Sequence, residues 1–517
     1  MRIHRLHIKS PWKNLEDFIV NFDERRDVAV IIGRNGSAKS NLLEAIITIF
    51  RNLDLNAPAP FAYELIYSIH GHRVVLTASA DKQPKAEVAG KPVSLHDVRI
   101  DWTPKYVVGY YSGVSDRFEE LFRKHDRIAR DLTLVPTKHD IKPTKLALRR
   151  FICARPVHGL FALLAFYFSK DEIVTSFLNE LPRIEAFDSA ILVLRRPTWA
   201  VSKKAGAEEF WDAKGPVREL LDRFRRYSLV PFSRIVTIKT NFARRESREL
   251  YYLFLPDIKA LHLLAAEYGS DPRALFQALD TMRLSGLIED FRVRVRVKGS
   301  AGAIHTRQLS EGEQQLLTVL GLMRFTRNAG SLYLLDEPDT HLNPAWEVDY
   351  LQQLRSIGGM EQNSHTLLAT HDPLLVAGLC KEEIRVLTRN QKGRILATEP
   401  EESPRGKGVA SVLTSPLYGL ESQLDPFSLR VLKRVYEVSM GERSEKKTRH
   451  LNLLRKLIPS LEIDESSPDP YRNIARKAYQ LSQRQILDSD ESTERKLILV
   501  DRLAEQLVEQ TSKEVEK

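Results

Sequence analysis

The chain of 517 residues contains only two cysteines, and this scarcity argues against two classes of protein. Cys153 and Cys380 lie far apart, and neither belongs to a C-x-x-C pair. A small domain held together by disulfides and a cysteine-bound zinc site are therefore both disfavoured. We predict that the two thiols are buried.

Long apolar runs are also missing. No apolar segment reaches the roughly 18 residues that a membrane-spanning helix needs, and the N-terminal MRIHRLHIKS lacks the apolar core of a signal peptide. These absences predict a cytoplasmic protein with no membrane partner. Acidic residues are outnumbered, because 68 Asp and Glu face 78 Lys and Arg, for a net charge of +10. This excess favours contact with a polyanion such as nucleic acid.

A glycine-rich stretch, IIGRNGSAKSNLLEAI, lies near the N-terminus at residues 31–46. The preceding VAVII predicts a buried strand, residues 33–38 a turn, and residues 40–50 a helix. A strand, a glycine-rich turn and a helix in this order form a phosphate-binding loop, in which backbone N–H groups and a lysine hold the phosphates. The predicted ATP contacts are Gly33, Arg34, Asn35, Gly36, Ser37, Ala38, Lys39, Ser40 and Asn41.

Ala38 occupies a position where such loops usually have glycine. Because the chain enters the helix here, we expect a negative φ, so that the methyl group costs space near the phosphates rather than backbone freedom. ATP binding should survive, and hydrolysis should be slow.

Further motifs follow in a fixed order: QLSEGEQQLL at residues 308–317, SLYLLDEPDTHLNP at residues 331–344, and TLLATHDP at residues 366–373. Together with the phosphate-binding loop they resemble the ATP-binding cassette (ABC) ATPases, in their chromosome-maintenance and RecF-like branch. The resemblance implies an α/β fold with an ABC-type P-loop ATPase head.

The residue types in these motifs suit ATP chemistry. Ser40 and Asp336 offer oxygen ligands to Mg²⁺. Glu337 is the candidate general base for the attacking water, and His371 is the candidate contact to the γ-phosphate. The expected cofactors are therefore ATP and Mg²⁺.

The signature-like segment, formed by Ser310, Glu311, Gly312 and Glu313, has two interpretations that are compatible. In the ABC family it opens a helix whose N-terminus caps the γ-phosphate of ATP bound to another copy, which implies head-to-tail protomers and a homodimer or larger even oligomer. Alternatively, Ser310 is an ordinary N-cap with Glu313 in the capping-box position.

Departures from the family pattern favour slow hydrolysis. The family usually has a glutamine-bearing loop, but Gln83 is the only glutamine between Ser40 and Gln277 and stands in a polar stretch. The expected equivalent is the end of a strand at residues 106–111, where Tyr111 and Ser112 stand instead. Asn343 replaces an acid after the DEP motif. ATP could then act as a clamp or sensor more than as fuel.

The interval between the loop and the signature shows no sustained heptads, and prolines interrupt it, which predicts a compact inserted lobe. Short segments resemble the PtuA-type ATPases of Septu and retron-associated antiphage systems: YYSG, ARPVHGLFALLAF, FWDAKGPVREL and LTSPLYGL. We predict head halves at residues 1–140 and 291–400, a mixed, mainly helical lobe at 141–290, and a helical partner-docking region at 401–517.

The C-terminal region shows no nuclease motif of its own. Its only D-x-D, at Asp488 and Asp490, follows no buried strand, and the spacing of an HNH nuclease is absent. The resemblance therefore implies an antiphage ATPase subunit that scaffolds and regulates a separate, PtuB-like HNH nuclease. Nucleic acid, or a retron reverse transcriptase with its DNA, is a further candidate partner.

Two other functions stay open. A RecF-like repair ATPase acting on DNA would use basic stripes such as Arg223, Arg225 and Arg226 around Phe224, or Arg292, Arg294 and Arg296 on one face of a strand. A charged, solvated strand edge would look the same. A transporter subunit is disfavoured by the long insertion, the missing glutamine loop and the helical tail.

Overall fold

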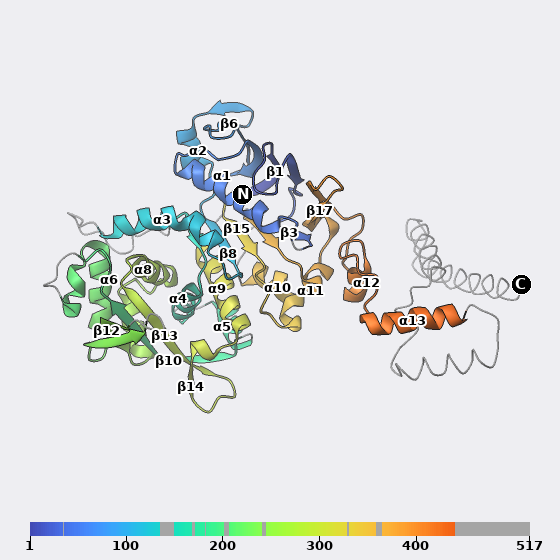
Figure 1. Cartoon of the computed structure of the whole chain (residues 1–517). Helices are drawn as coiled ribbons and strands as arrows, with labels where there is room; N and C mark the ends of the chain where they lie inside the picture. Colours follow the sequence, from blue (N-terminus) through green and yellow to red (C-terminus); the bar gives the residue numbers. More distant parts are fainter. Residues whose placement is uncertain are drawn as a thin grey trace, which may run out of the picture. The chain divides into compact units, whose positions relative to one another are not determined.

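The computed structural model of the chain describes residues 1–34, 36–134, 149–167, 171–180, 182–200, 206–239, 245–327, 330–357 and 364–439. The chain forms two compact units, Met1–Val412 and Leu413–Lys517. The described part of the first unit contains three β-sheets (Figure 1).

The central sheet carries the predicted nucleotide motifs. Its order is β18-β17-β3-β16-β15-β8-β9, and its neighbours are parallel except for the antiparallel pair β17 and β18. The strands are β3 (Val28–Gly33), β8 (Val107–Tyr111), β9 (Phe151–Cys153), β15 (Leu332–Asp336), β16 (His365–Ala369), β17 (Ile384–Arg389) and β18 (Ile395–Thr398). β15 and β16 are buried along their whole length, as strands covered on both faces are.

A second, antiparallel sheet has the order β2-β1-β4-β5-β6-β7. Its strands are β1 (Arg2–Ile8), β2 (Phe18–Asn21), β4 (Tyr63–Ile69), β5 (His72–Ala78), β6 (Lys85–Val88) and β7 (Lys91–Val93), with α2 (Leu95–Asp101) after them. Helix α1 (Lys39–Asp54) shares one apolar core with this sheet and the central sheet. Burial on nearly all sides holds α1, and with it the glycine-rich turn, in a fixed position.

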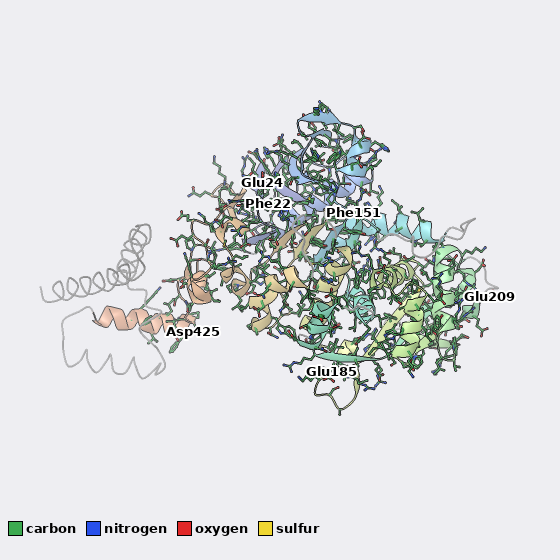
Figure 2. The ribbon with its side chains drawn as sticks, turned by 180° about the vertical axis from the view of Figure 1, so that it is seen from behind. Phe22, Glu24, Phe151, Glu185, Glu209 and Asp425 are labelled. Atoms are coloured by element: carbon green, nitrogen blue, oxygen red, sulfur yellow. The ribbon has the colours of Figure 1, made fainter. Side chains whose placement is uncertain are left out.

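The inserted lobe is built on an antiparallel sheet of order β11-β12-β10-β13-β14. Its strands are β10 (Ile184–Arg195), β11 (Phe232–Lys239), β12 (Arg245–Leu255), β13 (Ile288–Val297) and β14 (Ala303–His305). Figure 2 labels Glu185 on β10 and Glu209 on this lobe, and Phe151 on the edge strand β9. The predicted boundary at residue 290 falls inside β13. The division into four parts stays a prediction.

Helices surround these sheets. In the first unit they include α3 (Arg117–Leu134), α4 (Pro156–Phe166), α5 (Glu172–Glu180), α6 (Gly215–Arg226), α7 (Ile258–Ala266), α8 (Pro272–Leu284), α9 (Glu311–Thr326), α10 (Pro344–Ser356) and α11 (Pro373–Ala377). α4 and α9 pack closely through glycines, because a Cβ on Gly159 would lie 2.7 Å from Thr318 Oγ1 and one on Gly321 would lie 2.4 Å from Ala162 Cβ. This contact ties the lobe to the signature helix.

The second unit is described only in part. α12 (Gly408–Thr414) spans the boundary between the units, and α13 (Pro426–Ser439) lies in the region 401–517 that was predicted to be helical. The remainder of that region, with Asp488 and Asp490, lies outside the described residues.

Two expectations about burial and membranes can be compared with the structure. Cys153 is buried, but Cys380 is only half-buried, so that prediction is wrong for the second thiol. In the described parts of the chain, no helix combines the length and the hydrophobicity needed to cross a bilayer.

Candidate functional site

The strand register brings the predicted nucleotide motifs to one edge of the central sheet. Asp336, the last residue of β15, lies opposite Ala369 on β16 and Tyr111 on β8. Ala369 in turn lies opposite Ile31 on β3. Carboxyl ends of parallel strands meet at one edge, so the glycine-rich turn, the paired acids and the histidine loop are neighbours.

The phosphate-binding loop is closed by its lysine. Lys39 begins α1, and its Nζ donates to the Gly33 carbonyl at 2.9 Å. Burial lowers the pKa of Lys39, and the negative charges of Glu337, Asp336 and Asp339 oppose that shift. A side chain at Gly33 would force the backbone to shift, because its Cβ would lie 2.6 Å from the Leu387 carbonyl oxygen. Arg34 and Gly36 are exposed, and Asn35 lies outside the described residues.

Ala38 differs from the expectation. Its φ is +73°, in the left-handed region, and it is the residue before the first turn of α1. The prediction of a negative φ is therefore wrong. Glycine is favoured at this position for its backbone freedom, and alanine carries a backbone cost there.

Ser40 and Asp336 form the candidate metal site. Burial raises the pKa of Asp336 to about 6, and the nearby Ser40 hydroxyl opposes this rise. Asp336 Oδ2 is buried and has no hydrogen-bond partner among the described residues. A hydroxyl beside a carboxylate oxygen without a partner is a donor set that fits Mg²⁺.

Glu337 and His371 face each other beside this pair. His371 Nδ1 lies 3.0 Å from Glu337 Oε1, and their side chains are 60% and 32% exposed. Glu337 has a φ of +51°, and its N–H donates to the Ala369 carbonyl at 2.8 Å. A left-handed backbone at a non-glycine residue is typical of functional sites. The two predicted reacting side chains thus meet at the solvent-facing border of the site.

Asp339 and Thr370 were not predicted. Thr370 Oγ1 donates to Asp339 Oδ2 and accepts a hydrogen bond from the Asp372 N–H at 2.9 Å. Burial raises the pKa of Asp339 to about 6. The pair ties the loop of His371 to the segment after Glu337. Its sequence signal was the third acid of the DEPD run.

The signature segment forms the predicted helix start. Ser310 caps α9, accepting from the Glu313 N–H at 3.2 Å, while Glu313 Oε2 accepts from the Ser310 N–H at 2.7 Å. The capping-box interpretation is confirmed. Glu311 is exposed and lies 3.1 Å from His341 Nδ1. A Cβ on Gly312 would lie 2.4 Å from the His341 carbonyl oxygen, so close packing within one chain requires glycine there.

The residues that depart from the family pattern have visible roles. The Ser112 N–H donates to the Asp336 carbonyl at 3.2 Å, and Ser112 Oγ lies 3.3 Å from Thr340 Oγ1. Asn343 caps α10, with its Oδ1 accepting from the Trp346 N–H at 3.0 Å. Gln83 lies in the turn between β5 and β6, and its side chain donates to the Asn56 carbonyl. The residues after β8 therefore lie beside Asp336.

The basic stripes of the lobe are largely paired. Arg226 Nη1 lies 2.6 Å from Glu267 Oε1, and Arg225 Nη2 lies 3.0 Å from Asp222 Oδ1. Phe224 is 1% exposed, so its ring is not available to stack on bases. On β13, the arginines point outward and the valines inward, as expected.

Comparisons with known proteins agree with these motifs. A protein-family model described as "AAA domain, putative AbiEii toxin, Type IV TA system" matches residues 175–377. Over 193 residues the chain is 26% identical to Septu protein PtuA of Bacillus mycoides (strain KBAB4), covering 35% of this chain and 26% of that protein. Over 162 residues it is 26% identical to the "Retron Vc95 probable ATPase" of Vibrio cholerae serotype O1 biovar El Tor, covering 28% of this chain and 30% of that protein.

The resemblance to the PtuA-type ATPases is confirmed. The matched segments span less than a third of the length of either PtuA-type relative. The SMC head domain from Thermotoga maritima is 14% identical, with a TM-score of 0.33, over 78% of this chain and 100% of that one. The α/β fold class is confirmed by the sheet topology, whereas the ABC type stays a prediction.

Proposed function

We propose that the chain is the ATP-binding subunit of an antiphage defence complex and that it hydrolyses ATP slowly with Mg²⁺. The observation that carries this proposal is the pair Ser40 and Asp336, which presents a buried carboxylate oxygen without a partner beside Lys39. The matches to a Septu protein and a retron ATPase support the defence role.

Each residue of the site has a distinct task. Lys39, now bonded to Gly33, turns toward the phosphates and neutralises their charge. Ser40 and Asp336 would hold Mg²⁺, which would supply positive charge to offset the negative charge on the phosphate oxygens. Glu337 accepts a proton from the attacking water, and His371, 3.0 Å away, orients Glu337 and the γ-phosphate.

Slow hydrolysis follows from the residues beside Asp336. Ser112 places a hydroxyl and a backbone N–H where the ABC family has a glutamine side chain. A serine reaches less far than a glutamine, so the attacking water has one orienting group fewer. Nucleotide would then act mainly as a structural clamp or sensor.

We further propose that two protomers sandwich two ATP molecules, which makes the assembly an even homo-oligomer. The exposed start of α9 supports this arrangement, because Glu311 is 78% exposed and helix N-termini bind phosphate. The Ser310 hydroxyl is engaged with Glu313 in one chain. It would exchange this contact for the partner's γ-phosphate.

The chain is proposed to have no nuclease activity of its own and to hold and regulate a separate, PtuB-like HNH nuclease through the region 401–517. Nucleic acid, or a retron reverse transcriptase with its DNA, is a further proposed partner. This part rests on the resemblance to the PtuA-type ATPases.

Native mass spectrometry tests the proposal most directly. The chain is measured with and without ATP, as wild type and as Lys39→Ala, after co-expression with its genomic neighbours. An even assembly that keeps nucleotide, loses it in Lys39→Ala and retains a small HNH protein supports the proposal. A monomer without nucleotide contradicts it.

A RecF-like ATPase acting on DNA is the second candidate, favoured by the outward-facing arginines of β13 and the net charge of +10. It requires that the purified chain bind DNA without a partner, with an affinity that depends on ATP and falls steeply with salt. A DNA affinity that is the same with and without ATP would argue against the RecF-like function.

A further inference from the structure

The chain lacks a charged or amide side chain at the point where β8 ends beside Asp336. Tyr111 lies opposite Asp336, and Ser112 contacts the Asp336 carbonyl and Thr340. The hydroxyl of Ser112 offers a dipole but no charge. Another group must balance the negative charge of the phosphates on this side of the site if nucleotide is to bind tightly.

Arg117, the first residue of α3, reaches this side from the same chain. Its Nη2 donates to Asn41 Oδ1 at 2.6 Å, and its Nε donates to the Glu44 carboxylate. Its guanidinium carbon lies 5.8 Å from the centre of the Tyr111 ring. These contacts hold the guanidinium at the beginning of α1, where Asn41 directly follows Ser40.

The charges around Glu44 leave one positive charge in excess. The Glu44 side chain is 3% exposed and pairs with both Arg117 and Lys13. A buried carboxylate needs one cation for neutrality, so two cations around it provide a charge for another anion. Burial raises the pKa of Asp336 to about 6, and the positive charge of Arg117 is among the groups that oppose this rise.

A second contact set holds the same corner together. Asn41 Nδ2 donates to Asn14 Oδ1 at 2.6 Å, and Asn14 Nδ2 lies 3.4 Å from the Gly36 carbonyl oxygen. Arg117 is therefore linked through Asn41 and Asn14 to the phosphate-binding loop itself. A change at Arg117 acts on the loop as well as on the local charge.

We propose that Arg117 is a positioning residue of the nucleotide site, which places a second positive charge beside Lys39 and makes the site prefer nucleoside triphosphates to diphosphates. This inference rests on the proposed ATP binding. A triphosphate carries more negative charge than a diphosphate, so an added cation strengthens its binding more. No sequence motif marks Arg117, because it lies outside the phosphate-binding loop and after the strand where the glutamine is missing.

The first experiment measures equilibrium affinities by calorimetry in Mg²⁺ for a non-hydrolysable ATP analogue and for ADP. Arg117→Gln should lower the affinity for the ATP analogue about tenfold or more, and the affinity for ADP about threefold or less. Arg117→Lys should lie between, because it keeps the charge and loses the fork to Asn41 and Glu44. Arg123→Gln is the matched control on α3. Arg123 forms ion pairs with the exposed Asp116 and Glu120 on the surface, so this change should leave both affinities unchanged.

A second experiment distinguishes two roles of Arg117: its charge strengthens nucleotide binding, or it only neutralises Glu44. Without nucleotide, Arg117→Gln should lower the melting temperature, and the double variant Glu44→Gln/Arg117→Gln should restore it. The affinity for the ATP analogue should stay low in the double variant. Recovery of affinity there would show that Arg117 only neutralises Glu44, and would overturn the inference.

The outcomes also distinguish the inference from the proposed function. A wild-type chain that binds neither nucleotide contradicts the proposed function. A wild-type chain that binds the ATP analogue, together with an Arg117→Gln variant that binds it equally well, overturns the role of Arg117 alone.

Discussion

Two buried aspartates show how differently the same residue type behaves in the two parts of the first unit. Asp336 at the nucleotide site is 1% exposed, and Asp280 on α8 is 3% exposed. Burial raises the pKa of Asp336 to about 6. Burial would also raise the pKa of Asp280, but Arg149, Arg283 and His158 outweigh it and hold that pKa well below its usual range.

The difference lies in the partners. Asp280 accepts hydrogen bonds from Arg149 Nη1 and from Arg283 Nε, the second at 2.9 Å. His158 Nε2 lies 3.1 Å from Asp280 Oδ1. Asp336 keeps one oxygen without a partner among the described residues. A buried carboxylate that is hydrogen-bonded to several cations has its charge balanced within the fold, whereas one with an oxygen left without a partner is available to a metal ion. Burial alone therefore does not separate structural from functional acids in this protein.

The largest expected effect is the loss of the Asp280 charge. Asp280→Asn leaves Arg149 and Arg283 buried around a neutral group, and should lower the apparent free energy of unfolding by about 3–5 kcal/mol. Urea unfolding measures this. Asp222→Asn is the control, because its pair with Arg218 is about one-third exposed on both sides and should cost less than about 1 kcal/mol. Equal losses in the two variants would remove the distinction drawn for Asp280.

The next effect is a pH dependence that comes from the same cluster. His158 is fully buried, and burial lowers its pKa to about 4 despite the hydrogen bond to Asp280. Between roughly pH 6.5 and 4 the unfolded chain binds a proton at His158 that the folded chain does not, so the contribution of His158 to stability falls as the pH falls. From pH 7.5 to pH 5 this contribution should fall by about 2 kcal/mol.

Urea unfolding at the two pH values checks this slope. His158→Gln should flatten it, whereas His96→Gln, a change at an exposed histidine, should leave it as it is. A slope that is identical in all three proteins would assign the pH dependence to other groups.

Asp336→Asn should have the opposite sign to Asp280→Asn. In the absence of nucleotide the raised pKa means that the folded state carries a cost for the ionised form above about pH 6. A neutral asparagine removes this cost, and the apparent free energy of unfolding at pH 8 should rise by about 1–2 kcal/mol. At pH 5 the gain should be smaller.

The same variant should lose Mg²⁺-dependent ATP hydrolysis, measured by phosphate release. Stability and activity thus move in opposite directions at Asp336. A loss of stability as large as that of Asp280→Asn would make Asp336 a structural residue and break the comparison.

The smallest effect concerns the left-handed residue of the loop. Ala38→Gly should raise the apparent free energy of unfolding by about 0.5 kcal/mol. Glycine removes the backbone strain of a φ of +73°, and its greater freedom in the unfolded chain offsets part of this gain. We also expect faster ATP hydrolysis with nearly unchanged ATP affinity. Gly36→Ala is the reverse control, since its φ is +81° in open space and alanine should cost about 1 kcal/mol there. The same sign for both changes would contradict this account.

Local sequence patterns sufficed for the nucleotide motifs. The apolar runs before Gly33 and Asp336 and the cap at Ser310 depend on neighbours along the chain, and they predicted β3, β15 and the start of α9. Phe224 could not be placed in this way. Its arginine neighbours point to a nucleic-acid surface in sequence, while the fold buries its ring and pairs those arginines with Glu267 and Asp222.

Local sequence patterns predicted the α/β head and the residues that we propose to face the nucleotide, because strand, turn and helix signals depend on neighbours along the chain. Tertiary contacts alone make Ala38 left-handed, bring Arg117 to the first turn of α1, and shift the pKa values of Asp280 and Asp336 in opposite directions. These properties depend on groups far apart in the chain. Packing sets their distances and burial, and electrostatic energies depend on both.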